Sequence, residues 1–446
     1  MTTPILDFVR RYSESGTARL HMPGHKGAAF LGCEHLDITE IAGADDLFHA
    51  EGVIAESEQN AAALFGAGAT FYSTEGATLP IKAMLALAVQ NAPKTATCPR
   101  ILATRNAHKA FLYGCALLDV DVDWLYGESG HLCECRVSAE ALEHALATAE
   151  DPYCAVFVTS PDYLGSTLDI AALSTVCRAH KVPLLVDNAH GAYLAFSHPV
   201  CHPMTLGATM CADSAHKTLP ALTGTAYLHI AKDAPQSFFD GARQAMAMFA
   251  SSSPSYLLLQ SLDLCNAYLA NEFPAQLAEC TARVSGLREL LASVGYELLG
   301  DEPLKLAVDG RARGYTGEAL ANALREGGVE PEFTDRDLVV LMCTPQNTDE
   351  ELARVALALC SLPECEKVAK THTIMAHTAE KALSVREAML SAHKKIAVKD
   401  AAGRICAAPC VSCPPAIPIT VSGERITKEA IELFLAYGIE KIDVVI

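Results

Sequence analysis

Short apolar runs alternate with helix-like segments through the middle of the chain. Four of these runs predict buried strands, at residues 99–106, 153–161, 182–190 and 224–230. Helix-like segments, among them 138–149 and 169–181, separate several of the strands. Strands and helices in alternation predict an open α/β sheet whose strands are mostly parallel.

The pattern changes near residue 245. A serine-rich turn precedes a long apolar helix pattern, and a smaller α/β unit follows. Residues 372–396 predict a helix with charge on one side, and Thr427 is the expected N-cap of the last helix. Boundaries near 60, 245 and 365 predict four parts, which are an N-terminal segment (1–60), a large α/β domain (61–245), a linking helix with a small α/β domain (246–365) and a C-terminal α+β domain (366–446).

Charge and hydropathy narrow the class of protein. The 34 basic and 53 acidic residues give a formal charge of −19, which argues against nucleic acid and anionic membranes as partners. Mean hydropathy is +0.20, and no apolar run reaches the roughly 18 residues that a membrane span needs. The N-terminus lacks the pattern of a signal peptide, so we expect a cytoplasmic enzyme whose 17 cysteines are reduced.

One cysteine cluster needs separate consideration. Cys406, Cys410 and Cys413 have a spacing that can hold an iron–sulfur cluster in radical enzymes. In such enzymes a barrel normally follows the motif, and only 33 residues follow Cys413 here. A cysteine-rich loop is the favoured interpretation.

Polar residues follow several of the predicted strands. Asp187 directly follows the apolar run "VPLLV" (182–186), His108 lies four residues after the run "ILAT" (101–104), and Lys217 lies shortly after the apolar run 208–212. In an open α/β sheet, ligands bind at the carboxyl ends of the strands. The stretch 74–78, "TEGAT", precedes a predicted helix, whose N-terminus favours a phosphate.

Together these residues suit pyridoxal 5'-phosphate. That cofactor needs a lysine for a Schiff base, a carboxylate for its pyridine nitrogen, a flat group against its ring and donors for its phosphate. Each feature alone also has a structural interpretation. The lysine could be a surface residue, the aspartate a helix cap, the histidine a packing residue and the "TEGAT" stretch an ordinary turn.

The chain also resembles the bacterial Orn/Lys/Arg decarboxylase family, most closely its shorter members. Ordered motifs carry the resemblance over nearly the whole length, and they are "LHMPGHKG" (20–27), "LDITEIAGADDLFHAEGVI" (36–54), "RNAHKA" (105–110), "TSPDYLG" (159–165), "VDNAHGAY" (186–193), "SAHKTLPALTG" (214–224), "SSSPSYLLLQSLD" (251–263) and "CPPAIPITVSGERIT" (413–427). The resemblance implies a fold-type-I, aspartate-aminotransferase-like large domain that binds pyridoxal phosphate at 61–245.

The resemblance also implies roles for single residues. Lys217 would form the covalent Schiff base, Asp187 would pair with the pyridine nitrogen, and His108 and Ala189 would pack on the two ring faces. His190 would lie beside the cofactor and, with Lys217, is a candidate proton donor. The phosphate would be held by a further set of residues, namely Gly76, Ala77, Thr78, Ser214 and His216, with Ser253 reaching in from the partner subunit.

Four positions depart from the family pattern. Glu75 and Ala77 replace an asparagine and a hydroxyl residue in the phosphate turn, Asn188 replaces a glutamate, and Ala416 replaces a glycine. These changes bear on how tightly the phosphate is bound and on which substrate is chosen. They leave Lys217 and Asp187 in place, so the chemistry is expected to be retained.

The resulting hypothesis is decarboxylation of a basic L-amino acid to an amine of polyamine metabolism. Arginine is the first expectation, followed by lysine and ornithine. Glu332 and Asp335 are candidates to bind the side-chain cation, with a solvated turn as the plainer interpretation. We expect a homodimer or larger homo-oligomer with the site at the interface. The alternatives are an aminotransferase or lyase on the same fold, and a non-catalytic regulatory relative.

Overall fold

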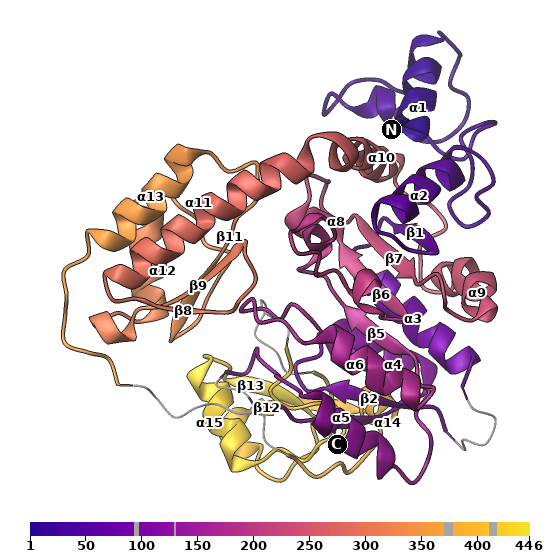
Figure 1. Cartoon of the computed structure of the whole chain (residues 1–446). Helices are drawn as coiled ribbons and strands as arrows, with labels where there is room; N and C mark the ends of the chain where they lie inside the picture. Colours follow the sequence, from indigo (N-terminus) through magenta and orange to yellow (C-terminus); the bar gives the residue numbers. More distant parts are fainter. Residues whose placement is uncertain (93–97, 129–130, 370–377, 410–416) are drawn as a thin grey trace. The chain divides into compact units, whose positions relative to one another are not determined.

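The computed structural model describes residues 1–92, 98–128, 131–369, 378–409 and 417–446. The chain forms two compact units (Figure 1). The first unit consists of Met1–Asn91 and Cys177–Gln276, and the second of Ala92–Val176 and Leu277–Ile446.

Four neighbouring strands form the centre of the first unit. Their order is β1 (Ala69–Ser73), β7 (Ala226–Ile230), β6 (Met210–Ser214) and β5 (Leu184–Asp187). β5 and β6 run parallel, whereas β7 is antiparallel to both of its neighbours. Every residue of β5, β6 and β7 is buried, as expected for strands covered on both faces.

Helices surround these strands. α3 (Thr78–Gln90) packs against α9 (Gln236–Ala247) and against β6 and β7. The remaining helices of the first unit are α1 (Pro4–Glu14), η1 (Glu34–Leu36), α2 (Val53–Leu64), η2 (Ala192–Phe196), α7 (Pro203–Leu206), α8 (Ala215–Thr218) and α10 (Tyr256–Asn271). α6 (Ile170–Ala179) and α11 (Phe273–Ser293) each contribute residues to both units.

The second unit contains three parallel strands in the order β4 (Ala155–Thr159), β2 (Arg100–Thr104) and β3 (Asp121–Leu125). α4 (Lys109–Leu118) and α5 (Ala139–Ala147) accompany them. The parallel strands of both units confirm the predicted, mostly parallel α/β fold.

The second unit also contains two antiparallel sheets. The larger one has the order β10 (Phe333–Thr334), β11 (Leu338–Met342), β9 (Lys305–Asp309) and β8 (Glu297–Leu299). The smaller one pairs β12 (His393–Ala397) with β13 (Lys441–Val445). The helices of this region are η3 (Arg311–Arg313), α12 (Gly317–Glu326), α13 (Asp349–Cys360), α14 (Val385–Leu390), η4 (Val398–Asp400) and α15 (Lys428–Ala436). A shared apolar core joins the two sheets through residues such as Phe333, Leu338, Phe434 and Ile442.

The helix predicted over 372–396 is wrong for the described part of that range. α14 covers only Val385–Leu390, and His393–Ala397 forms strand β12. The strand pairs with β13, about fifty residues further along the chain, and a local pattern does not reveal such a partner. The cap prediction is confirmed, since the Ala430 N–H donates to Thr427 Oγ1 at 3.1 Å.

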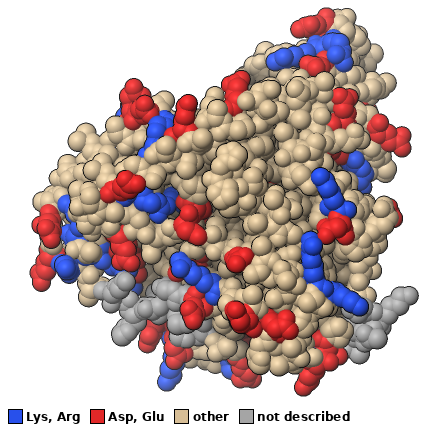
Figure 2. Space-filling view, in the orientation of Figure 1, with Lys and Arg blue, Asp and Glu red and all other residues tan. Residues whose placement is uncertain are grey.

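The surface charges, the helices and the cysteines can be compared with the expectations from composition. Acidic and basic side chains are interspersed on the face shown in Figure 2. Within the described ranges, no helix is both long and apolar enough to cross a membrane. The cysteines of these ranges are free thiols. Cys410, Cys413 and Ala416 lie outside the described residues, while Cys406 is buried.

Candidate active site

Asp187 is the last residue of β5 and lies at the carboxyl end of the parallel strands. Its side chain is buried, and the Ala189 N–H donates to Oδ1 at 3.2 Å. Among the described residues, this is the one hydrogen bond that the carboxylate receives. Burial raises the pKa of Asp187 to about 6, although the charge of Lys217 acts in the opposite direction. The carboxylate is therefore short of donors and lies close to a cation.

Lys217 lies in the short helix α8, which follows β6 directly. Its Nζ is 3.0 Å from Nε2 of His190, a buried residue just after β5. Two neighbouring strand ends thus bring together the amine, the imidazole and the carboxylate that the sequence predicted. A proton can pass between Nζ and Nε2 at this distance.

The "TEGAT" turn, the predicted anion cradle, lies at the start of α3. Gly76 has a φ of +64°, and a methyl group there would meet no described atom within 4 Å. Its N–H donates to Gly224 O at 2.7 Å, which fixes the turn. The N–H groups of Thr78 and Leu79 begin the helix and have no partner within it. This arrangement leaves open space beside two donors and the positive end of the helix dipole.

Glu75 occupies one side of this cradle. Its Oε1 accepts the Ser251 N–H at 2.6 Å, so the serine turn of the same chain lies beside the cradle. Ser253 belongs to that exposed turn. Its predicted contact in a partner subunit stays a prediction.

Ser214 is the N-cap of α8, and His216 lies within this helix. Ser214 is buried at the end of β6, and Nδ1 of His216 contacts Thr225 O at 2.9 Å. Burial lowers the pKa of His216, so the neutral ring, with its proton on Nδ1, offers Nε2 as an acceptor. A hydrogen bond between His216 Nε2 and a phosphate therefore requires either a protonated phosphate oxygen or a second proton on the imidazole ring.

His108 belongs to the second unit. It is the N-cap of α4, where Nδ1 accepts the Ala110 N–H at 3.1 Å. This hydrogen bond fixes the imidazole ring at the N-terminus of α4, and a residue that stacks on a cofactor ring needs a fixed orientation of this kind. Its predicted place against the cofactor ring stays a prediction.

The residues of the first unit fit pyridoxal phosphate. The turn has open space and N–H groups without a partner inside the helix, which suit a phosphate, and the Asp187 carboxylate, which receives a single hydrogen bond from the described residues, suits a protonated ring nitrogen. Lys217 is half-buried and its amine faces the same strand ends. A carboxylate after β5, a lysine after β6 and a helix N-terminus after β1, in one sheet, are the features expected of a fold-type-I pyridoxal-phosphate enzyme.

The chain belongs to the Orn/Lys/Arg decarboxylase family. It matches the family's major domain over residues 3–302 and its C-terminal domain over residues 364–440. The protein is accordingly an amino-acid decarboxylase by class.

Similar proteins agree with this assignment. The chain is 30% identical to an arginine decarboxylase of Bacillus anthracis over 96% of its own length and 92% of the relative's. It is 29% identical to an uncharacterized Bacillus subtilis protein, YaaO, over 97% and 93% of the two chains. The fold matches the constitutive lysine decarboxylase of E. coli with a TM-score of 0.79 at 16% identity, covering 100% of this chain and 82% of the other.

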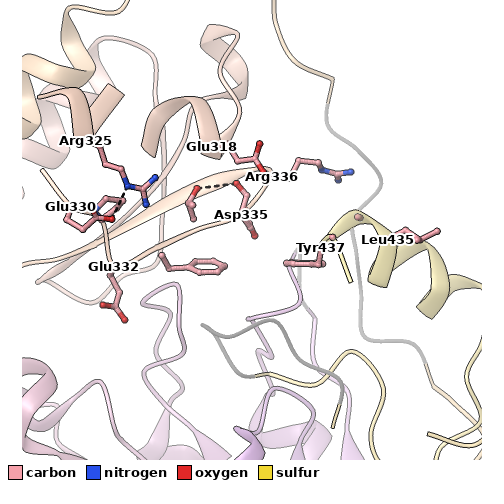
Figure 3. A pocket seen from close by; sticks show the side chains of 13 residues that line it. Glu318, Arg325, Glu330, Glu332, Asp335, Arg336, Leu435 and Tyr437 are labelled. Atoms are coloured by element: carbon pink, nitrogen blue, oxygen red, sulfur yellow. Dashed lines mark hydrogen bonds and ion pairs between the residues drawn. The ribbon is translucent and has the colours of Figure 1, made fainter. Parts of the chain in front are cut away.

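The two predicted substrate carboxylates, Glu332 and Asp335, line a pocket of the second unit (Figure 3). Asp335 is already satisfied, because Oδ2 contacts His131 Nε2 at 2.8 Å and Oδ1 accepts the N–H groups of Asp337 and Leu338. Glu332 is exposed and accepts one hydrogen bond, from the Tyr163 hydroxyl at 2.9 Å. Of the two, Glu332 has more capacity to bind a cation.

The sequence analysis missed Asp213, which directly precedes Ser214. It is fully buried and contacts Asn188 and His202. An aspartate directly after the apolar run 208–212 was the available signal, because a carboxylate that continues a buried strand needs partners.

Proposed function

We propose that this protein decarboxylates a basic L-amino acid, arginine first, with pyridoxal phosphate held covalently by Lys217. The observation that carries the proposal is the contact between Lys217 and His190 beside Asp187, at the ends of β5 and β6. Arginine is favoured because several of the similar curated proteins are named arginine decarboxylases.

Each residue has a defined task. When bound, pyridoxal phosphate supplies a ring that accepts the electron pair left by the departing CO2. Asp187, as the carboxylate, holds a proton on the ring nitrogen. Lys217 would hold the cofactor, and its amine, when free, would lie within reach of His190.

Lys217 and His190 can then return a proton to the α-carbon. The 3.0 Å separation lets either group carry that proton and lets the other replace it. Burial of Asp187 and His190 keeps water from the charged groups and strengthens their interactions. The N–H groups of Thr78 and Leu79, which follow the turn at Gly76, would orient the phosphate.

The test is CO2 release from arginine, lysine and ornithine by the purified protein with added pyridoxal phosphate, with amine products identified by mass spectrometry. Release from one of the three supports the proposal and names the substrate. Formation of a keto acid instead would show an aminotransferase. Failure to bind the cofactor would favour a non-catalytic relative.

Glu332 is the proposed site for the substrate's side-chain cation. Glu332→Gln should raise KM for the preferred substrate about tenfold or change the preference, with kcat little affected. Asp335→Asn serves as the comparison, since its carboxylate is already hydrogen-bonded. An unchanged KM and preference in Glu332→Gln would refute this assignment.

We also propose a cytoplasmic homodimer in which Ser253 approaches the partner's phosphate turn. The support is family membership together with the exposed position of the serine turn. Sedimentation at several protein concentrations tests the dimer.

A further inference from the structure

Asp213 lies at the centre of a buried polar cluster behind the candidate site. Its Oδ1 accepts the Asn188 Nδ2–H at 2.7 Å, and Oδ2 contacts His202 Nε2 at 2.8 Å. Nε2 of His229 lies 3.4 Å from the same Oδ2. All four side chains are fully buried. We refer to Asn188, His202, Asp213 and His229 as the Asp213 cluster.

The cluster joins segments that are far apart in sequence. Asn188 follows β5, Asp213 lies in β6, His229 lies in β7, and His202 precedes α7. His229 extends the connection to β1, because its Nδ1 is 2.7 Å from Thr70 Oγ1. The strand end that carries Asp187 is thus tied to the strand end that leads to Lys217.

A backbone bond reinforces this tie. The Asn188 N–H donates to Ala212 O at 3.0 Å, directly beside the side-chain bond to Asp213. Asn188 is therefore held to β6 by both its backbone and its side chain. Since Asp187 is the preceding residue, its position depends on this double anchor.

The carboxylate of Asp213 is stable as an anion. Burial raises its pKa, but the interactions with His202 and His229 outweigh burial and hold the pKa well below the usual range. Asp213 therefore remains an acceptor for both of its anchors near neutral pH.

A buried metal site is the competing interpretation, because His202, Cys211 and Asp213 have ligand atoms within 4.8 Å of one another. The hydrogen bonds of His202 argue against a metal site. The Met204 N–H donates to Nδ1 of His202 at 3.3 Å, so the ring's proton is assigned to Nε2, the atom that faces Asp213. A metal-bound nitrogen carries no proton, and burial also raises the pKa of the Cys211 thiol well above its usual value.

Asp213 also explains why this chain has Asn188 where the family pattern has a glutamate. A glutamate there would place a second carboxylate against Asp213, whereas the amide of Asn188 donates to it. The amide's Oδ1 is buried and has no hydrogen-bond partner among the described residues, so the bond to Asp213 fixes its orientation.

We propose that Asp213 is a positioning residue for the cofactor: it anchors Asn188 and thereby fixes Asp187 relative to the strand end that leads to Lys217. The inference rests on the proposed function, because the position of Asp187 matters only if a cofactor binds there. It assigns Asp213 no contact with the cofactor or the substrate.

The test compares Asp213→Ala and Asp213→Asn with the same changes at Asp263. Asp263 is a buried aspartate of the same unit, in α10, and it accepts hydrogen bonds from Ser57 and Leu6. The readouts are the dissociation constant of pyridoxal phosphate, the circular dichroism of its visible band and the Tm of the apoprotein. Wild-type protein is measured alongside.

We expect both alanine variants to lower Tm, while only Asp213→Ala weakens cofactor binding, about tenfold, and alters the circular dichroism. Asp213→Asn should restore most of the affinity, because the Asn188 amide can turn over and keep one hydrogen bond. A dissociation constant for Asp213→Ala within twofold of wild type, with an unchanged spectrum, would overturn the proposal.

If Asp213→Ala does not fold, Asn188→Ala takes its place, because it removes the anchor and keeps the contact between Asp213 and His202. The same loss of affinity is expected, and wild-type affinity in this variant would overturn the proposal. Wild-type protein that binds no cofactor would refute the proposed function itself. A wild type that binds and releases CO2, with unaffected Asp213 variants, would refute only the role of Asp213.

Discussion

Two buried aspartates occupy neighbouring strand ends in opposite ways. Asp187, at the end of β5, receives one backbone hydrogen bond, and burial raises its pKa to about 6. Asp213, in β6, contacts Asn188, His202 and His229, and its pKa lies well below the usual range. The Asp213 carboxylate has the partners that a buried charge needs, whereas at Asp187 the proposed cofactor would supply the missing donor.

The largest expected effect belongs to Lys217. Lys217→Ala should reduce CO2 release by at least about a thousandfold, because it removes both the attachment point and a proton donor. It also removes the cation that lowers the pKa of Asp187, so that pKa should rise further in the apoprotein. Initial rates and the visible absorption band measure the first effect, and Lys232→Ala, an exposed lysine of the same unit, is the control.

Asp187→Asn tests the comparison most directly. It should lower kcat about a hundredfold or more while stabilising the apoprotein by about 2 to 3 kcal/mol at pH 7.5, because it removes a buried, poorly paired charge. The folded pKa of about 6 lies above the ordinary 3.8, so the cost of the charge is full above pH 6 and vanishes below pH 3.8. The gain should therefore disappear near pH 3.5 in urea unfolding of the apoprotein.

Asp213→Asn should change the free energy of unfolding in the opposite direction when it is measured by the same urea unfolding. Loss of a well-paired buried carboxylate should destabilise the apoprotein. If both variants lowered the free energy of unfolding equally at pH 7.5, the distinction between the two strand ends would be wrong.

His190→Gln should have an intermediate effect. We expect kcat to fall about ten- to a hundredfold with KM within threefold, because the glutamine cannot carry the proton that passes to or from Lys217. Steady-state kinetics with the preferred substrate measure both constants. An unchanged kcat would assign proton return to Lys217 alone.

The smallest effect is expected at Glu75. Its carboxylate lies beside the anion cradle, so Glu75→Gln should tighten binding of pyridoxal phosphate about three- to tenfold. Binding of pyridoxal, which has no phosphate, should not change. Glu56→Gln, in α2, is the matched control, and equal tightening of both ligands would show that Glu75 does not act on the phosphate.

Local patterns predicted much of the fold and part of the site. The apolar run that became β5 ended in Asp187, and the run before Lys217 became β6, so the strand-end argument placed both residues correctly at one edge. Asp213 was missed because its partners, Asn188 and His202, are 25 and 11 residues away in the sequence, and only the tertiary fold brings them together. The error at 372–396 has the same origin, since β12 depends on pairing with β13.

The most direct measurement identifies the lysine that holds the cofactor. The protein is mixed with pyridoxal phosphate, reduced with borohydride, digested and mapped by mass spectrometry, after recording its visible spectrum. The account predicts a visible band that borohydride removes, with the added mass on Lys217 at one equivalent per chain. Label spread over exposed lysines, or confined to another residue, would contradict the assignment of the active site.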